Sequence, residues 1–166
     1  MTTTRLAPVP DGDAVLRLLE RPDLAVTLRW RNHADSRGWF HTTDPISDDQ
    51  HRAWFEGYLQ RADDYVFVLE LGGIRVAQAS LYDVDATSAE FGRLLVDPSR
   101  RGAGLSHRVI ALCLRVADEH LGLERVHLEV KRDNTRAIRA YRRAGFQDVA
   151  RAARASDSIV MERRVR

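Results

Sequence analysis

The sequence predicts an α/β fold, in which one domain over residues 1–166 carries a mixed central sheet of about seven strands with flanking helices. Three observations lead to this prediction. Short apolar strands joined by tight turns fill residues 65–96, a glycine turn then opens an amphipathic helix, and an alternating strand precedes a second such helix. With 166 residues, 44% of them hydrophobic and 30% charged, the chain has the size and composition of a single globular domain.

The N-terminal third has the weakest local signals. We expect a short strand over Thr3–Val9, a helix over Asp11–Glu20, and either a helix or a strand over Leu24–Trp30. The Ser-x-x-Gln pattern of Ser47–Gln50 is a capping box, so a helix should begin there. His51, in the first turn of that helix, is expected to be exposed.

The middle of the chain predicts an antiparallel meander. Tyr65–Leu71 and Ile74–Leu81 are apolar runs separated by two glycines, which is the pattern of a tight hairpin. Ser88–Val96 is the third strand. Gly92 lies inside it, and a glycine in the interior of a strand often marks a bulge or a close backbone approach.

A glycine- and arginine-rich turn follows the meander. Pro98 prevents the strand from continuing, and apolar residues recur at helical spacing from Leu105 to about Leu121. The first turn of such a helix leaves backbone N–H groups free at the positive end of its dipole, and Gly102 and Gly104 allow close approach to them. This strand–turn–helix unit is therefore either a diphosphate-binding site or only a tight structural connection between the strand and the helix.

The last third continues with a strand, a helix and two more strands. Arg125–Lys131 alternates apolar and polar residues. Asp133–Thr135 supplies cap residues for a helix that ends at Gly145, and Phe146–Arg151 and Ser158–Val165 should be two closing strands.

Composition excludes several classes of function. A net charge of +2 does not indicate a nucleic-acid partner. The single cysteine, Cys113, cannot form an internal disulfide, and without a Cys partner we expect no metal site. No apolar run has the length of a membrane span and the N-terminus has no signal-peptide core, so we expect no membrane partner and a cytoplasmic location.

Several short motifs in the correct order resemble the GNAT acyl-CoA N-acyltransferases. They are Val96-x-Pro98-x-x-Arg101-Gly102-x-Gly104, Leu128-x-Val130, and Asn134-x-x-Ala137-Ile138-x-x-Tyr141-x-x-x-Gly145-Phe146. Ser99 stands where the commonest form of the family signature has Gln or Arg. The shorter Pro-x-x-Arg-Gly-x-Gly form resembles the branch that contains ribosomal-protein and nucleotide-aminosugar acetyltransferases.

The resemblance implies an acetyl-CoA site without a metal. Its pyrophosphate would bind the amides of the glycine turn, its pantetheine arm would pair with the strand before that turn, and Gly92 would lie where two parallel strands splay apart. The residues assigned to the cofactor in this way are Leu94, Leu95, Val96, Arg101, Gly102, Ala103, Gly104, Leu105, Ser106 and Asn134.

Acyl transfer to an amine needs two proton transfers, one from the amine and one to the departing thiolate. Tyr141 occupies the family's usual acid position, and a phenol is still protonated at neutral pH. Glu129, on the polar face of its strand, is the candidate base, acting directly or through water. Glu90 is the alternative base, and His127 is a third choice.

The resemblance also suggests where the acceptor binds. Trp30, Arg31, Asn32 and Trp39 resemble the acceptor region of the aminosugar enzyme, and Glu90 is a further candidate contact. We therefore expect a small amine, such as a nucleotide-linked aminosugar. A protein N-terminus and a non-catalytic CoA-binding domain are the alternatives, and because homodimers are common in the family, monomer and homodimer both stay open.

Overall fold

The computed structural model describes residues 5–166 and shows an eight-stranded mixed sheet in the order β1-β2-β3-β4-β5-β6-β8-β7. The strands are β1 (Val9–Asp11), β2 (Ala14–Leu18), β3 (Tyr65–Leu71), β4 (Ile74–Tyr82), β5 (Ser88–Val96), β6 (Arg125–Lys131), β7 (Gln147–Asp148) and β8 (Ser158–Arg164). The pair β5–β6 is parallel and the other pairs are antiparallel.

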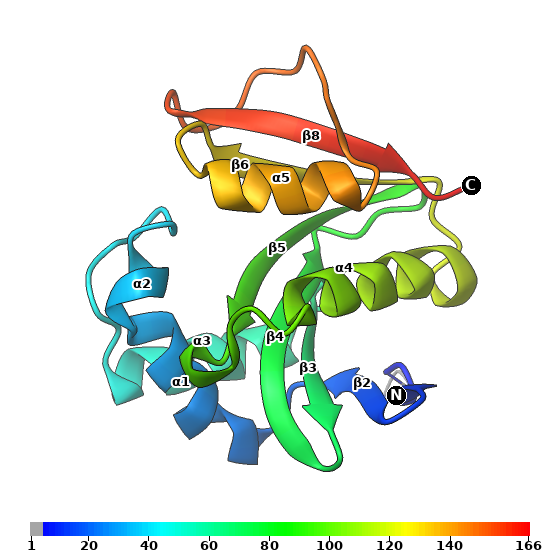
Figure 1. Cartoon of the computed structure of the whole chain (residues 1–166). Coiled ribbons are helices and arrows are strands. Elements are labelled where there is room, and N and C mark those ends of the chain that lie inside the picture. The colour runs from blue at the N-terminus through cyan, green and yellow to red at the C-terminus, as the bar shows by residue number, and fades with distance from the viewer. Residues whose placement is uncertain (1–4) are drawn as a thin grey trace.

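Helices cover both faces of this sheet (Figure 1). They are α1 (Leu24–Asn32), α2 (Ala34–Arg37), α3 (Asp48–Leu59), α4 (Leu105–Arg115) and α5 (Thr135–Arg143), with single turns of 3₁₀ helix at Arg21–Asp23 and Pro98–Arg100 and of π helix at Val116–His120. Alternate residues of β3 show the two faces. Phe67 and Leu69 belong to the core cluster that contains α4, whereas Val66 and Val68 pack with Phe55 of α3.

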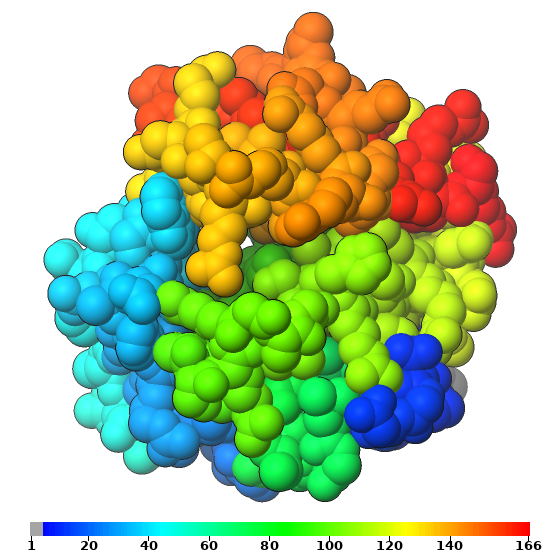
Figure 2. All heavy atoms as spheres, viewed as in Figure 1, coloured from blue at the N-terminus to red at the C-terminus, as the bar shows by residue number. Residues whose placement is uncertain are grey.

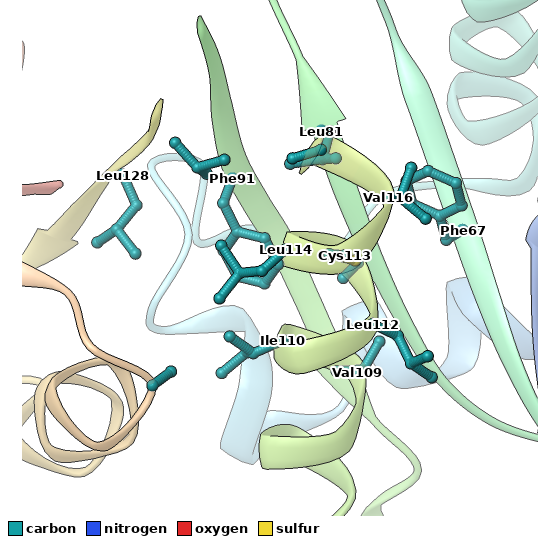
Figure 3. Packing of buried hydrophobic residues seen from close by; sticks show 14 of the residues in the cluster. Phe67, Leu81, Phe91, Val109, Ile110, Leu112, Cys113, Leu114, Val116 and Leu128 are labelled. Atoms are coloured by element: carbon teal, nitrogen blue, oxygen red, sulfur yellow. The ribbon is translucent and has the colours of Figure 1, made fainter. Parts of the chain in front are cut away.

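The larger core lies between α4 and the sheet. Ile110 and Cys113 of α4 are fully buried against Leu81 and Phe91 of the strands (Figure 3). Burial raises the pKa of the Cys113 thiol, which is therefore protonated and acts as a small apolar side chain.

The predicted helix over Asp11–Glu20 is wrong. Those residues form a β1–β2 hairpin that turns at Gly12, where φ is +61°. The apolar residues of this segment fit either periodicity, and pairing of β2 with β3 decides in favour of a strand. The first predicted strand is also displaced, because β1 begins only at Val9, and its start at Thr3 lies outside the described residues.

The structure confirms the predicted meander and capping box and corrects the predicted exposure of His51. The meander and its Gly72-Gly73 turn are confirmed, and both hydrogen bonds of the Ser47/Gln50 capping box are present at 3.1 and 2.8 Å. Residues 24–30 are helical. His51 is buried instead of exposed: it contacts Thr27 at 3.3 Å and stacks on Trp54, because α3 turns this side toward α1.

The predicted strand Phe146–Arg151 is only two residues long. Gln147 and Asp148 pair with β8, after which residues 149–157 form a loop. Arg154 ties this loop to Glu129 of β6 instead of continuing the ladder.

Strands β5 and β6 pair only at one end. Ser88–Glu90 lies beside Arg125–His127, and beyond that point the two strands diverge (Figure 1). The divergence coincides with a bulge in β5, where the register with β4 shifts between Gln78 and Ser80. The edge of β5 that faces away from β4 is therefore open over its second half.

Candidate active site

A cleft of about 650 Å³ opens where β5 leaves β6. Its walls are β5, the glycine turn, α5 and the segment around α2, and Figure 2 shows the hollow between the α5 and α4 regions. The cleft is lined by most residues assigned to the cofactor from sequence: Leu94, Leu95, Val96, Arg101, Gly102, Gly104, Leu105, Ser106 and Asn134. Ala103, which is exposed, does not line it.

The glycine turn is shaped by its backbone. Gly102 and Gly104 have φ angles of +84° and +75°, and a Cβ built on either would meet nothing within 4 Å. Gly104 is the N-cap of α4, so the first amides of that helix lack intrahelical acceptors. The turn thus offers open N–H groups at a positive helix end, which suits an anionic ligand.

The bulge in β5 is centred on Arg93, whose φ of +52° is unusual for a residue with a side chain. Gln78 Nε2 donates to the Arg93 carbonyl at 3.1 Å. On the other face of the sheet the Arg93 guanidinium pairs with Asp64 at 2.7 Å and stacks over Tyr82 at 4.4 Å. These contacts hold the bulge that exposes the backbone of Leu94–Val96 to the cleft.

Tyr141 lies in the cleft wall on α5. Its ring contacts Phe91 and Phe146 edge-on, with centroids 6.0 and 5.9 Å away. Burial raises the pKa of Tyr141 to about 12, so the phenol is protonated at neutral pH.

Glu90 and Glu129 lie side by side at the far end of the cleft, and both also line a second cavity of about 330 Å³. Their side chains are only 7% and 8% exposed. Tyr82 Oη donates to Glu90 at 2.9 Å, and His127 Nε2 lies 3.9 Å from the same carboxylate. The structure therefore places together both candidate bases and the third choice.

A residue that the sequence reasoning missed connects these carboxylates. Arg154 donates from Nε to Glu129 at 2.7 Å, from its backbone N–H to Glu129 at 2.8 Å, and from its guanidinium to Glu90. Burial works to raise the pKa of Glu129, but hydrogen bonds from Arg154 and Ala155 outweigh it and hold that pKa below its usual value. Arg154 belongs to an irregular loop, so no local pattern marks it.

Three of the residues assigned to the acceptor do not line the cleft. Trp30 is 3% exposed, Arg31 stacks over Phe40, and the Asn32 side chain bonds both backbone groups of Ile46 at 2.7 and 2.8 Å. These contacts fix the segment that follows α2. Trp30, Arg31 and Asn32 therefore do not form a wall of this cleft, in contrast to the expectation from sequence.

The α2 segment itself reaches across the cleft. Arg101 bonds Asp35 at 3.0 Å and Ser36 at 3.1 Å, and Lys131 Nζ bonds the carbonyl of Gly38 at 3.0 Å. Trp39, in the same segment, lines the cleft and is 47% exposed. The Arg101 guanidinium thus faces the Asp35 carboxylate, while Arg101 also lines the cleft expected to bind the cofactor.

Residues 5–166 contain neither a membrane-spanning helix nor a cluster of metal-binding side chains. No helix there is long and apolar enough to cross a membrane. In the same residues, no group of three or more His, Cys, Asp or Glu side chains is arranged to hold a metal ion.

Comparison with known sequences gives consistent matches. A family model described as an acetyltransferase (GNAT) domain matches residues 13–147. The spermidine N(1)-acetyltransferase of Escherichia coli K12 is 27% identical over 148 residues, which cover 83% of this chain and 75% of that protein. The mycothiol acetyltransferase of Mycolicibacterium smegmatis is 31% identical over 156 residues, covering 87% of this chain and 50% of that protein, so the chain spans about half the length of this relative.

Solved structures share the fold. The spermidine N-acetyltransferase of Vibrio cholerae, in complex with CoA and spermine, has a TM-score of 0.82 at 21% identity, covering 93% of this chain and 96% of that chain. The N-acetyltransferase PseH of Campylobacter jejuni has a TM-score of 0.73 at 15% identity, covering 92% and 99%. At these identities the likeness concerns the fold alone.

Proposed function

Because the chain belongs to the GNAT acetyltransferases and is an acetyl-CoA-dependent N-acetyltransferase, we propose that its acceptor is a small primary amine bound beside Glu90 and Glu129. The observation that carries the proposal is the pair of nearly buried carboxylates where the two cavities meet. A protonated amine is the ligand that two such carboxylates favour. Asp83 and Asp85 line the second cavity and add negative charge on its outer side, which Arg151 partly offsets.

The cleft fits acetyl-CoA, which supplies the acyl group as a thioester. The open space over Gly102 and Gly104 and the free amides of α4 suit its diphosphate. The unpaired edge of Leu94–Val96 suits the amide groups of its pantetheine arm, as an added strand would. Asn134 already accepts from the Ala137 N–H through Oδ1, so its amide NH₂ is the group available to the cofactor.

Side chains of the protein accept and donate the protons of the acyl transfer. The bound ammonium group first gives one proton to a carboxylate. The amine nitrogen then forms a bond to the acetyl carbon while the carbon–sulfur bond breaks, and the thiolate receives the proton of the Tyr141 hydroxyl. The second proton of the nitrogen leaves to water, from which the Tyr141 phenolate is protonated again. We assign Glu129 as the base, directly or through water, with Glu90 as the alternative. Arg154 and Ala155 hold the oxygens of Glu129, whereas Glu90 faces Tyr82, Arg154 and His127.

A second acceptor class is an aminosugar, including nucleotide-linked ones. The observation that favours it is Trp39, whose exposed ring lines the cleft and suits stacking on a sugar or base. This support is narrower than the sequence suggested, because Trp30, Arg31 and Asn32 are engaged elsewhere.

The first experiment is calorimetric titration of the protein with acetyl-CoA. Gly104→Glu should abolish binding, because it adds a negative side chain to the open turn. Gly72→Glu is the matched control: its φ of +54° is also positive, nothing lies within 4 Å of its Cβ, and it lies at the hairpin away from the cleft. Failure of the folded wild-type protein to bind acetyl-CoA would contradict the assignment of the cleft.

The second experiment identifies the acceptor class. Acetyl-CoA turnover is measured with spermidine, with a nucleotide-linked aminosugar and with a peptide that has a free N-terminus. We expect turnover with a small amine and its loss in Glu90→Gln or Glu129→Gln. If only the peptide is acetylated, the result would instead support a protein N-terminus as the acceptor.

A further inference from the structure

We propose that Arg154 is a specificity-determining residue, whose guanidinium occupies the acceptor's ammonium site between Glu90 and Glu129 until the acceptor displaces it. This inference deepens the proposed function and rests on it. It gives Arg154, in the loop of residues 149–157, a role beyond holding the oxygens of Glu129.

The charges explain why the guanidinium lies there. Two carboxylates with little solvent contact destabilise each other unless a cation lies between them. Glu90 and Glu129 are 7% and 8% exposed, and Arg154 contacts both. The other titratable or charged side chains that line the second cavity are Asp83, Asp85, His127 and Arg151. Arg154 alone joins both carboxylates within the described residues.

The chain around Arg154 favours release. Its side chain is 59% exposed, so the guanidinium reaches the carboxylates from the solvent side and is not enclosed by the core. Backbone bonds fix the two ends of the loop, from the Val149 N–H to the Val160 carbonyl at 3.1 Å and from the Arg132 N–H to the Asp157 carbonyl at 2.8 Å. Between these ends, the loop is held to β5 and β6 by the bonds of Arg154 and Ala155 to Glu129 and Glu90. An amine that enters the second cavity therefore meets Arg154 as a competitor of the same charge.

This arrangement sets a requirement for the acceptor. A neutral molecule cannot replace the guanidinium without leaving two buried carboxylates unpaired. A cationic amine replaces it with charge conserved. We therefore infer that Arg154 selects for acceptors that arrive protonated and excludes neutral amides and alcohols of similar size.

The test uses chemical replacement of the side chain and needs no known acceptor. Arg154→Ala is titrated with millimolar ethylguanidinium chloride, with ethylurea as the neutral isostere and sodium chloride as the ionic control, and the thermal midpoint is recorded. We expect ethylguanidinium to raise the midpoint of Arg154→Ala by a few degrees, to leave wild type unchanged, and to lose its effect in Arg154→Ala/Glu129→Gln. An equal response of wild type and Arg154→Ala would overturn the proposal.

If Arg154→Ala does not fold, Arg154→Lys replaces it in this experiment. The lysine ammonium lacks the planar fork that spans two carboxylates, so ethylguanidinium should raise the thermal midpoint of Arg154→Lys more than that of wild type. A response equal to that of wild type would again be contrary to the proposal.

Kinetics give the second arm with an acceptor from the screen. Arg154→Ala should lower KM for a cationic acceptor several-fold and leave KM for acetyl-CoA unchanged, because an internal competitor is gone. A rise in acceptor KM would mean that Arg154 contacts the acceptor itself, and the proposal fails. A failure of the proposed function appears separately, as absent acetyl-CoA binding or turnover, while the thermal experiment is independent of both.

Discussion

The guanidinium of Arg93 pairs with the carboxylate of Asp64 at 2.7 Å, and this contact joins the β5 bulge to the opposite face of the sheet. Asp64 is 1% exposed and Arg93 has a φ of +52°. A side chain in this backbone region costs free energy, and the fold retains it because the ion pair and the stacking on Tyr82 outweigh the strain. The open edge of β5 therefore depends on Asp64, a residue that does not line the cleft.

Arg93→Ala should lower the free energy of unfolding by about 3 kcal/mol, because it leaves the buried Asp64 carboxylate without its main partner. Arg93→Gly loses the same ion pair but tolerates the positive φ, so it should be less destabilised than the alanine variant by about 1 kcal/mol. Urea unfolding measures both values. We also expect KM for acetyl-CoA to rise in both variants, and an unchanged KM would show that the bulge does not depend on Arg93.

Tyr141→Phe should reduce kcat by about 10²- to 10³-fold, because it removes the proton donor and little else. KM for acetyl-CoA should stay close to the wild-type value, since the ring still packs against Phe91 and Phe146. Steady-state kinetics test this, with the thermal midpoint as a check on folding. Because general-acid catalysis contributes far more than about two-fold, a kcat within about two-fold of the wild-type value would show that Tyr141 is not the proton donor.

The pH dependence of kcat should reflect the raised pKa of Tyr141. A group with a pKa of about 12 is protonated throughout the usual assay range, so no loss of general acid should be seen up to about pH 10. An ordinary phenol would already be half ionised at that pH. A kcat profile that falls with a midpoint near 10, and does so in wild type but not in the residual activity of Tyr141→Phe, contradicts the burial argument.

Gly92→Ala should disturb the site from the strand interior. A Cβ at Gly92 would lie 2.9 Å from the Tyr82 ring, which also donates to Glu90. We expect a loss of about 1–3 kcal/mol in stability, as for other overpacked positions, and a higher acceptor KM. Gly57→Ala is the matched control: it lies exposed in α3 with nothing within 4 Å of its Cβ, so it should be neutral or stabilising.

Asp35→Asn should tighten acetyl-CoA binding about two- to five-fold, because exposed ion pairs of this kind are worth less than about 1 kcal/mol and Arg101 is then free to face phosphate. Calorimetry measures the dissociation constant. In an Arg101→Ala background the same change should have no effect. If the effect persists there, Asp35 acts independently of Arg101.

The sequence alone determined the elements whose signals are local. The Gly72-Gly73 hairpin, the Ser47/Gln50 capping box and the glycine turn before α4 each depend on residues within a few positions of one another. Backbone preferences and side-chain periodicity act over that range, so they can be identified without a partner. The family motifs around Tyr141 are local in the same way.

Tertiary structure decided the features that depend on distant partners. Residues 14–18 became a strand because β3 pairs with them, although their apolar pattern also fits a helix. Trp30 is buried, Arg31 stacks over Phe40 from a later segment, and Arg154 reaches Glu90 across 64 positions of sequence. Ion pairs and packing between segments that are far apart have no short-range pattern, so only the folded chain shows that Glu90, Glu129 and Arg154 share one site.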